Sequence, residues 1–280
     1  MHFRALIRLL AVLVIGALPP LHAQPANVAA MRVSEPLQFR VVRTIPHDPA
    51  RFTQGLAWHD GTLFESTGRY GESALFALNP ATGATLRARS LTREVFAEGL
   101  ARVRDTLVQL TWRERRAFRY GEDLAPRGEW RYDGEGWGLT HDGKAFVMSD
   151  GSSELQFRSD QDFRLLRRLP VRDGREPIGL LNELEYAHGL VLANVWMDDR
   201  IAVIDPASGS VRAWLELGAL TRGFARPPGF DPDEHVLNGI AHDPQRDRYY
   251  VTGKCWPVIY ELEIPALPRL LGLPTANTTK

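Results

Sequence analysis

The sequence has a single cysteine, Cys255, in 280 residues, so no disulfide can form within one chain. A chain of this length can bury enough apolar surface to be stable without disulfides, even in an oxidising compartment. Cys255 stands in the strand-like run Gly-Lys-Cys-Trp. We predict that it is a buried small hydrophobic side chain, because that role is commoner for an isolated cysteine than the role of a catalytic thiol.

The sequence also has no excess of charge of either sign. Its 34 lysines and arginines are balanced by 34 aspartates and glutamates. Proteins that bind nucleic acids or anionic membranes usually carry a basic surface that matches the charge of the partner. We therefore expect neither a nucleic acid nor a membrane as a partner of this chain.

The N-terminal apolar run is too short to cross a membrane as a helix. It extends from Leu9 to Leu18, about half of the roughly 20 apolar residues that a transmembrane helix needs. Basic residues precede it, and the small residues before Gln24 resemble a signal-peptide cleavage site. We predict a cleaved signal peptide over 1–23, an N-terminal tail over 24–35, and an exported protein that is periplasmic or secreted.

The most informative feature is a repeated Gly-Leu-like step. Its second residues are Gly55, Gly99, Gly138, Glu183 and Gly239, at intervals of 44, 39, 45 and 56 residues. Each step leads through a polar turn to a strand with alternating apolar residues, and a second hairpin-like pair follows. Four short strands in about 40 to 45 residues is the period of a β-propeller blade. Apolar residues recur at every second position, which excludes a helical repeat.

Five such units predict an all-β, five-bladed propeller over 36–265. The last unit supplies only three strands, and we predict that the N-terminal strand 39–45 closes this last blade and covers its open edge. The long last interval is due to 221–235, a segment rich in proline and glycine that we predict to be a loop. Residues 266–280 are predicted to form a C-terminal tail, and we expect the protein to be a monomer.

The repeat places a set of side chains at one mouth of the propeller. The start of each first strand and the end of its partner lie at the same end of a hairpin. The residues there are Gln54, Glu98, Trp137, Asn182 and Asn238 on the first strands and Gly68, Trp112, Gly151, Trp196 and Lys254 on the second. We predict a concave pocket with one carboxylate, one ammonium, amides and three indoles, the usual form of a small-ligand site.

Histidines are predicted to lie away from this mouth. His59, His141, His188 and His242 fall in the turns at the other end of the hairpins, whereas a Ser-His-Asp triad would need a histidine at the mouth. The sequence has no His-Glu-x-x-His run and no Cys/His cluster. We therefore predict no metal site and expect no cofactor.

Short sequence motifs follow one another along the five units. They include Phe-Thr-Gln-Gly-Leu at 52–56, Phe-Ala-Glu-Gly-Leu at 96–100, Glu-Gly-Trp-Gly-Leu at 135–139, Leu-Asn-Glu-Leu at 181–184, Leu-Asn-Gly-Ile at 237–240 and Thr-Gly-Lys at 252–254. In these motifs, from about residue 40 to 264, the chain resembles the glutaminyl-peptide cyclotransferases of the plant and bacterial β-propeller type. It departs from that family at Ala97, where glycine is frequent.

The resemblance implies that N-terminal glutaminyl residues of peptides or proteins are converted to pyroglutamyl residues with release of ammonia, without a catalytic metal. It also implies which residues form the site. These are Glu98 as the acid/base, Asn182 and Lys254 as polar helpers, and Phe52, Gln54, Phe96, Trp112, Trp137 and Trp196 as the substrate pocket.

The chemistry of these residue types is consistent with that reaction. A carboxylate such as Glu98 can take a proton from an attacking amine and return it to departing ammonia. Lys254 and Asn182 can donate hydrogen bonds to a developing oxyanion. Because the amine must be neutral to attack, we expect activity to rise from acidic to mildly alkaline pH.

Two alternatives remain open from the sequence. A propeller that only binds a ligand would use the same pocket without turnover. A metal-dependent, lactonase-like propeller enzyme would need several oxygen ligands around one ion, and Glu98, Asn182 and Asn238 are the only candidate set. Lys254 at the same mouth would repel a cation, which makes this second alternative the weaker one.

Overall fold

The described part of the chain consists almost entirely of β-structure. A computed structural model describes residues 36–271, so the predicted signal peptide, the predicted N-terminal tail and residues 272–280 lie outside the described range. The helical segments within this range are α1 (Gly218–Thr221) and a 3-10 helix (Leu267–Arg269). No helix within 36–271 is both long enough and apolar enough to span a membrane.

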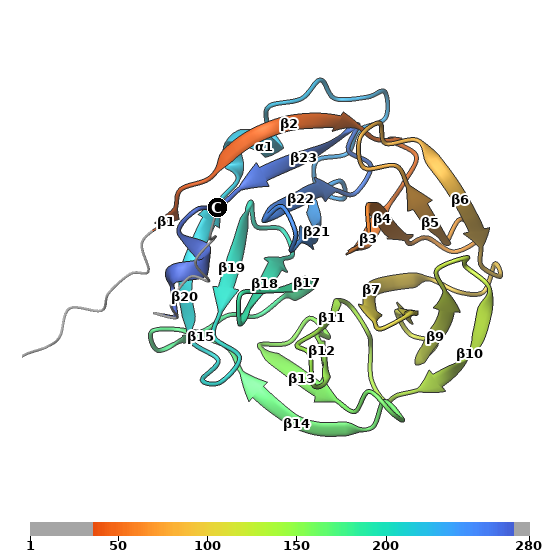
Figure 1. The fold of residues 1–280 in the computed structure, drawn as a ribbon, viewed down its shortest axis with the longest axis horizontal. Helices are drawn as coiled ribbons and strands as arrows, with labels where there is room; N and C mark the ends of the chain where they lie inside the picture. Colours follow the sequence, from red (N-terminus) through yellow and green to blue (C-terminus); the bar gives the residue numbers. More distant parts are fainter. Residues whose placement is uncertain (1–35, 272–280) are drawn as a thin grey trace, which may run out of the picture. The chain divides into compact units, whose positions relative to one another are not determined.

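The strands form five antiparallel blades arranged in a closed ring, which confirms the predicted five-bladed propeller (Figure 1). From the innermost strand outwards, the first blade is β3 (Thr53–His59), β4 (Thr62–Thr67), β5 (Ala74–Leu78) and β6 (Thr85–Ser90), and the second is β7 (Ala97–Val103), β8 (Thr106–Thr111), β9 (Arg116–Gly121) and β10 (Pro126–Arg131). The third is β11 (Leu139–His141), β12 (Phe146–Met148), β13 (Glu154–Arg158) and β14 (Leu165–Pro170), and the fourth is β17 (Leu181–Ala187), β18 (Leu190–Val195), β19 (Arg200–Ile204) and β20 (Val211–Glu216). The fifth begins with β21 (Leu237–Asp243), β22 (Arg248–Gly253) and β23 (Val258–Glu263), and a two-stranded hairpin, β15 (Arg172–Asp173) and β16 (Glu176–Pro177), follows the third blade.

The N-terminal strand completes the fifth blade, as predicted. β2 (Arg40–Pro46) pairs antiparallel with β23, with Arg40 opposite Glu263 and Pro46 opposite Val258. The short strand before it, β1 (Pro36–Leu37), pairs in parallel with β20 of the fourth blade, which the sequence did not predict. One N-terminal segment therefore covers the outer edges of both the fourth and the fifth blade (Figure 1).

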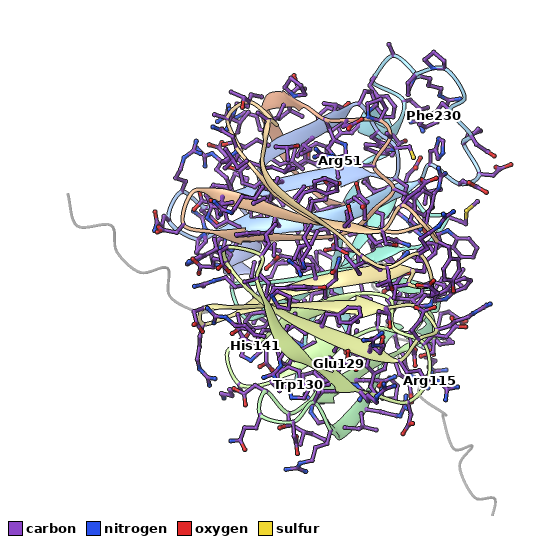
Figure 2. All side chains as sticks on the ribbon, turned by 90° about the vertical axis from the view of Figure 1, so that its right-hand side faces the viewer. Arg51, Arg115, Glu129, Trp130, His141 and Phe230 are labelled. Atoms are coloured by element: carbon purple, nitrogen blue, oxygen red, sulfur yellow. The ribbon has the colours of Figure 1, made fainter. Side chains whose placement is uncertain are left out.

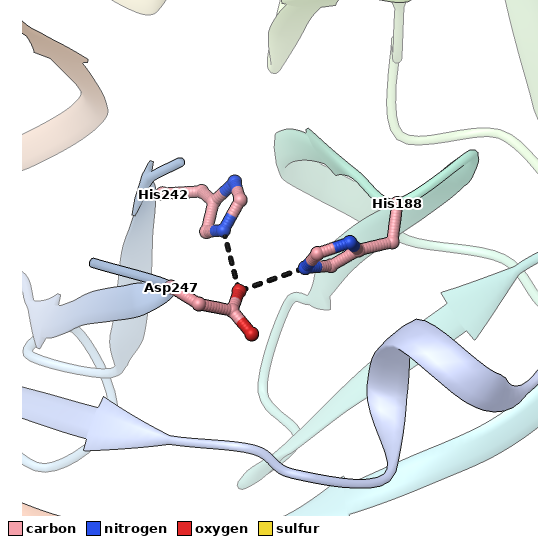
Figure 3. A group of neighbouring side chains, drawn as sticks. All are labelled: His188, His242 and Asp247. Atoms are coloured by element: carbon pink, nitrogen blue, oxygen red, sulfur yellow. Dashed lines mark hydrogen bonds and ion pairs between the residues drawn. The ribbon is translucent and has the colours of Figure 1, made fainter. Parts of the chain in front are cut away.

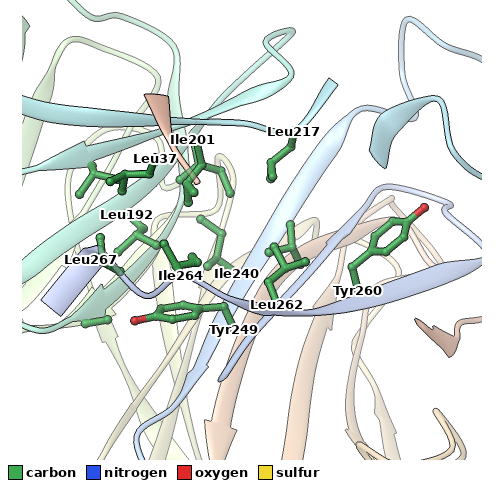
Figure 4. Close-up of a cluster of buried hydrophobic side chains, with 14 of the residues drawn as sticks. Leu37, Leu192, Ile201, Leu217, Ile240, Tyr249, Tyr260, Leu262, Ile264 and Leu267 are labelled. Carbon is green, nitrogen blue, oxygen red and sulfur yellow. The ribbon is translucent and has the colours of Figure 1, made fainter. Parts of the chain in front are cut away.

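The hydrophobic core is divided into five clusters, one between each pair of neighbouring blades. The largest lies between the fourth and fifth blades, where Leu192 and Ile201 face Ile240 and Leu262 (Figure 4). Each blade thus buries both faces against its neighbours, which explains why the middle strands are apolar on both sides.

Leu267 belongs to the same large cluster and is completely buried. It lies within 266–280, the segment predicted to be a tail. The structure differs from that prediction, because the 3-10 helix packs its apolar residue against the last two blades. The rest of that segment, from residue 272, lies outside the described range.

The repeated glycines lie where the innermost strands approach one another. A Cβ atom at Gly138 would lie 1.9 Å from the backbone oxygen of Asn182, and one at Gly99 would lie 2.6 Å from that of Trp137. Only glycine allows neighbouring strands to come this close around the central axis. The glycine of the repeat is therefore required by the ring packing of the blades.

The fourth blade has Glu183 where the other blades have this glycine. Its carboxyl group is completely buried and accepts hydrogen bonds from the backbone N–H groups of Leu56, at 3.1 Å, and Ile240, at 2.8 Å. Burial raises the pKa of Glu183 well above its ordinary value, although these two hydrogen bonds oppose the shift. Glu183 thus connects the innermost strands of three blades across the axis.

The two faces of the propeller carry different residues. His141, at the turn of the third blade, lies at one face, and Arg115 and Phe230 lie at the opposite face (Figure 2). Phe230 belongs to the segment predicted to be a loop over 221–235, which contains no strand between α1 and β21.

Cys255 is 4% exposed, in agreement with the prediction of a buried side chain.

Candidate active site

In four of the five blades, an equivalent backbone hydrogen bond joins the two ends of the first hairpin at the mouth of the propeller. The backbone N–H groups of Gly68, Trp112, Trp196 and Lys254 donate to the carbonyl oxygens of residues 52, 96, 180 and 236, each at 2.8 or 2.9 Å. Each accepting residue stands two positions before the first-strand residue of the predicted site. The start of one strand and the end of the next are thereby held together at the mouth.

A cavity of about 500 Å³ opens at this mouth. All nine residues that the sequence analysis assigned to the site line it, and they are Phe52, Gln54, Phe96, Glu98, Trp112, Trp137, Asn182, Trp196 and Lys254. They come from all five blades or the segments that lead into them. The structure therefore brings the whole predicted set together, while the chemical role of each residue stays a prediction.

Glu98 is the buried acid of the cavity. It is 5% exposed, and its Oε1 accepts a hydrogen bond of 3.0 Å from Nε2 of Gln54. The Oε1 of Gln54 in turn accepts a bond of 2.9 Å from Nδ2 of Asn238, which also donates to the carbonyl oxygen of Thr53. Two amides in series thus hold one oxygen of the Glu98 carboxyl group in place.

The pKa of Glu98 is raised well above its ordinary value, mainly by burial. The positive charge of Lys254 opposes this shift, and the negative charges of Glu135 and Glu114 add to it. A carboxyl group in this environment can hold a proton much closer to neutral pH than an exposed glutamate, as general acid–base catalysis requires.

Lys254 faces the same cavity from the end of β22. It is 6% exposed, and its ammonium group lies 4.9 Å from the centre of the Phe52 ring. Burial lowers the pKa of Lys254, whereas the charge of Glu98 raises it. The net shift is downward, so this ammonium loses its proton at a lower pH than an exposed lysine.

Asn182 offers the cavity an unused hydrogen-bonding atom. Its side chain is 3% exposed, and Oδ1 is buried without a hydrogen-bond partner among the described residues. Its backbone oxygen accepts a bond of 2.6 Å from the hydroxyl of Ser149 and adjoins Gly138, so the main chain at this point is fixed. A buried amide oxygen without a partner costs free energy unless a ligand supplies one.

Aromatic rings form the walls. Phe96 packs edge to face against Phe52, at 6.3 Å between ring centres, and against Trp112, at 5.5 Å. Trp137 and Trp196 form a second edge-to-face pair at 6.0 Å. These contacts restrict the orientation of each ring and give the cavity a shape of its own.

Two mouth glycines make room for these rings. A Cβ atom at Gly68 would lie 2.4 Å from Cε1 of Phe96, and one at Gly151 would lie 2.7 Å from Cζ2 of Trp137. Of the five second-strand positions, two carry an indole, these two glycines leave space for an aromatic ring from a neighbouring segment, and the fifth carries Lys254.

Glu135 belongs to the site and was not predicted as a site residue. Its Oε2 accepts hydrogen bonds from Nε1 of Trp112, at 2.7 Å, and from Nε1 of Trp137, at 3.1 Å. Its Oε1 accepts a bond of 3.0 Å from Arg113, whose guanidinium lies 3.7 Å from the centre of the Trp112 ring. Burial alone would raise the pKa of Glu135, but these hydrogen bonds outweigh it and the pKa is lowered.

Four further charged residues of the cavity wall were also missed, namely Arg69, Arg113, Asp233 and Glu234. Two of them directly follow mouth residues in the sequence, and that adjacency is a signal that sequence reasoning could have used. The two acids belong to the loop before β21. Their approach to the mouth depends on the path of that loop, which the repeat pattern does not describe.

The sequence shows no local run of potential metal ligands, but in the structure His188, His242 and Asp247 lie together, with one ligand atom of each within 4.8 Å of the others. His188 lies in a turn, as predicted, whereas His242, also predicted to lie in a turn, is a residue of β21 next to its end. The sequence could not reveal the cluster because its members come from two different blades.

The match with known proteins covers most of the chain. The family model described as glutamine cyclotransferase matches residues 11–264. This chain belongs to the glutamine cyclotransferase family. A relative named glutaminyl-peptide cyclotransferase, from Arabidopsis thaliana, is 38% identical over 230 residues, which are 81% of this chain and 71% of the relative. The crystal structure of Myxococcus xanthus glutaminyl cyclase is similar with a TM-score of 0.74 and 37% identity, covering 82% of this chain and 98% of the other.

Membership of the glutamine cyclotransferase family agrees with the position of the cavity in the chain. The matched range, 11–264, contains all five blades and every residue that lines the cavity. The resemblance seen in the sequence motifs is therefore confirmed at the level of the family.

Proposed function

We propose that this chain is a glutaminyl-peptide cyclotransferase that acts on peptides and proteins with an N-terminal glutamine. The names of the similar proteins support this proposal, and the site supports it independently. The observation that carries it is the buried carboxyl group of Glu98 with a raised pKa, in one aromatic cavity with Lys254 and Asn182. A cavity of about 500 Å³ is large enough for a terminal glutamine and the following peptide bond.

In the proposed reaction the substrate is both nucleophile and electrophile. Its α-amino nitrogen attacks the carbonyl carbon of its own γ-amide, and a carbon–nitrogen bond forms. The bond from that carbon to the amide nitrogen then breaks, ammonia leaves, and a five-membered lactam remains. Because both groups belong to one residue, the enzyme mainly has to hold a bent conformer and move protons.

Glu98 is the proposed proton carrier. As a carboxylate it takes a proton from the attacking nitrogen, and as the acid it delivers this proton to the departing nitrogen, so the enzyme ends as it began. Gln54, held by Asn238, keeps the carboxyl group oriented for both transfers. General acid–base catalysis of this kind contributes about 10²- to 10⁴-fold to the rate.

Lys254 and Asn182 are the proposed partners of the polar substrate atoms. The Lys254 ammonium and the Asn182 N–H donate to the oxygen of the tetrahedral intermediate, where each well-placed donor is worth about 3 kcal/mol. The Oδ1 of Asn182, which has no partner within 36–271, accepts a hydrogen bond from a substrate N–H group. One side chain can thus fix both the oxygen and the nitrogen of the reacting residue.

The aromatic walls have two proposed tasks. They press the flexible glutamine side chain into the bent conformer, and they exclude water that would hydrolyse the amide to glutamate. Glu135 keeps Trp112 and Trp137 in the required orientation through its two indole hydrogen bonds. This makes it a positioning residue.

The geometry does not favour the metal-dependent lactonase-like alternative. Of its three proposed ligands, Asn238 does not line the cavity, although its Oδ1, the atom that would bind a metal, has no hydrogen-bond partner among the described residues. The cationic Lys254 is a wall of the same cavity and would repel a metal ion. A propeller that only binds a ligand is separated from the enzyme by a test for turnover.

Mass spectrometry of a Gln-initiated peptide before and after exposure to the protein tests the activity. We expect loss of ammonia from this peptide. An Asn-initiated peptide should not react, because its cyclisation would require a four-membered ring, and an N-acetylated Gln peptide should not react because its amine is blocked. Binding of the Gln peptide without loss of ammonia would establish the binding-only alternative instead.

We also propose that the chain is exported to the periplasm or secreted and acts as a monomer. The proposal of export is supported by the basic, apolar and small-residue segments of 1–23. Cell fractionation combined with N-terminal sequencing is the test, and the expected mature chain begins at Gln24. Light scattering of the purified protein tests the monomer.

A further inference from the structure

Two histidines and an aspartate converge at the turn end of the hairpins, whereas the cavity lies at their other end. Figure 3 shows the three side chains. His188 lies in the turn between β17 and β18, His242 near the end of β21, and Asp247 in the turn before β22. The Nε2 atoms of His188 and His242 lie 2.7 Å and 2.9 Å from the same oxygen, Oδ1 of Asp247. Three potential ligand atoms are thus gathered within 4.8 Å of one another.

This cluster is separate from the active site. His188 stands six residues after Asn182 along the fourth blade, which corresponds to about 20 Å of extended strand. The cluster joins the fourth blade, through His188, to the fifth, through His242 and Asp247. No residue of the cavity wall belongs to it.

The fifth-blade half of the cluster is held rigidly. His242 is paired with Tyr249 in the strand register, and the two rings are stacked at 4.6 Å with an angle of 20° between their planes. The hydroxyl of Tyr249 donates a hydrogen bond of 3.2 Å to Oδ1 of Asp247. The positions of the imidazole and the carboxylate are therefore set by the sheet itself.

Solvent reaches two of the three side chains. The side chains of His188 and Asp247 are 29% and 42% exposed, whereas that of His242 is 8% exposed. An ion from solution can therefore enter between the three side chains without opening the fold, and water can remain bound to it.

We propose that His188, His242 and Asp247 form a binding site for one divalent transition-metal ion of the Zn²⁺ class. Two imidazole nitrogens and one carboxylate oxygen are a usual protein donor set for zinc, with water at the fourth position. Imidazole also favours Ni²⁺ and Cu²⁺, whereas Mg²⁺ and Ca²⁺ favour sites made of oxygen alone. On binding, bonds of about 2.0–2.2 Å from the metal to Nε2 and Oδ1 replace the present hydrogen bonds.

The bound ion would link two neighbouring blades. These are the blades whose outer edges the N-terminal segment covers, through β1 and β2, and between which the largest core cluster lies. The site therefore lies at the joint between the fourth and fifth blades, which the N-terminal segment also spans. Metal binding to the folded chain shifts the unfolding equilibrium towards that chain.

The test uses the full chain without an affinity tag, treated with EDTA and dialysed. Titration calorimetry with ZnCl₂ should show one saturable site per chain, and thermal unfolding should occur at a higher temperature with ZnCl₂. CaCl₂ at the same concentration should produce neither effect. The Glu98→Gln variant should bind Zn²⁺ as the unaltered chain does, since the cavity takes no part.

Three variants locate the site. His188→Gln and Asp247→Asn should each weaken Zn²⁺ binding by about tenfold or more, with cyclase activity retained as a check on folding. His141→Gln is the matched control, because His141 occupies the position in the third blade that His242 occupies in the fifth, and it should leave binding unchanged. Absence of a saturable Zn²⁺ site in the unaltered chain, or equal affinity in the His188→Gln and Asp247→Asn variants, would show that the cluster is only a hydrogen-bonded blade contact.

Discussion

The carboxylate of Glu135 lies 2.7 Å from the indole nitrogen of Trp112, and the same oxygen also accepts the indole N–H of Trp137. One acid thus orients two walls of the substrate cavity. The guanidinium of its third partner, Arg113, lies 3.7 Å from the centre of the Trp112 ring. The shape of the aromatic cavity therefore depends on a charged residue that does not have to take part in the chemistry.

Glu135→Ala should raise KM for a Gln-initiated peptide about tenfold with a much smaller change in kcat. Hydrogen bonds to a charged group contribute about 1.5–3 kcal/mol, and loss of wall orientation weakens ground-state and transition-state binding alike. Steady-state kinetics and the fluorescence of the indoles measure the effect. Glu135→Gln, which keeps an acceptor oxygen, should lie between this variant and the unaltered chain. A fall in kcat at constant KM would contradict a positioning role.

Glu98→Gln should lower kcat/KM about 10²- to 10⁴-fold without loss of the fold. Glutamine has nearly the same shape but cannot carry the proton. Circular dichroism checks the fold, and ammonia release measures the rate. Retention of more than about a tenth of the activity would remove Glu98 from its proposed role.

The same variant should be more stable than the unaltered chain at neutral pH. Because the folded-state pKa of Glu98 is raised, its ionisation favours the unfolded chain, and this destabilisation begins above the unfolded pKa of about 4.3. The difference between the two proteins should therefore grow as pH rises from about 4.3 towards the folded-state pKa of Glu98. Thermal unfolding at several pH values measures it, and a variant that unfolds at lower temperature throughout would contradict the burial argument.

The activity of the unaltered chain should follow a bell-shaped pH profile. The acidic limb reflects the raised pKa of Glu98 and deprotonation of the substrate amine, and the alkaline limb reflects the lowered pKa of Lys254. Lys254→Arg should move the alkaline limb to higher pH, because a guanidinium stays charged. An alkaline limb that does not move in this variant would mean that another group titrates there.

Glu65→Gln should lower the free energy of unfolding by about 3–5 kcal/mol, as expected when one partner of a buried charge network is removed. Glu65 is completely buried and accepts hydrogen bonds from His47 at 2.9 Å, Thr53 at 2.7 Å and Arg51 at 3.1 Å. Two of these partners, Arg51 and Thr53, flank the cavity residue Phe52 in the sequence. Urea denaturation measures the loss, and Asp160→Asn, which removes a surface ion pair with Arg104, is the control with an expected loss below about 1 kcal/mol.

The stability lost in Glu65→Gln should depend on pH in a defined way. Burial opposes both charges, but the interaction between His47 and Glu65 outweighs it, so the pKa of His47 is raised and that of Glu65 is lowered. The contribution of Glu65 is present above about pH 4.3 and is lost as pH falls through its folded-state pKa. That of His47 is complete below about pH 6.5 and is lost as pH rises through its folded-state pKa. The gap between the two proteins should be widest between these limits, and a gap independent of pH would contradict the charge network.

The repeat pattern was sufficient to predict most of the fold. It also predicted which residues of the first and second strands meet at one mouth of the propeller. The spacing of the Gly-Leu-like steps placed Glu98 and Asn182 at equivalent first-strand positions and Lys254 at the end of a second strand, and a ring of equivalent blades brings these positions together at one mouth. The closing strand β2 was predictable for a similar reason, because the last unit lacked its outer strand. The pairing of β1 with the fourth blade was not, since two residues carry too little pattern.

The missed features depend on contacts between blades. Glu135 stands two residues before Trp137, but its bond to Trp112 requires the second and third blades to be side by side. Leu267 reads as part of a tail because the apolar residues there, Leu267, Leu270 and Leu271, are too few to show a period. Its burial is decided by the surface between the last two blades.

Composition, hydrophobic alternation and the spacing of the five Gly-Leu-like steps were enough for the fold class, the number of blades and the placement of Glu98, Asn182 and Lys254 at one mouth of the propeller. They report local geometry, and a repeated fold turns local geometry into a ring. The direction of the Glu98 and Lys254 pKa shifts, the orientation of the indoles by Glu135 and the meeting of His188 with Asp247 were decided only by the folded chain. Burial and contacts between separate blades have no counterpart in the order of residues along one strand.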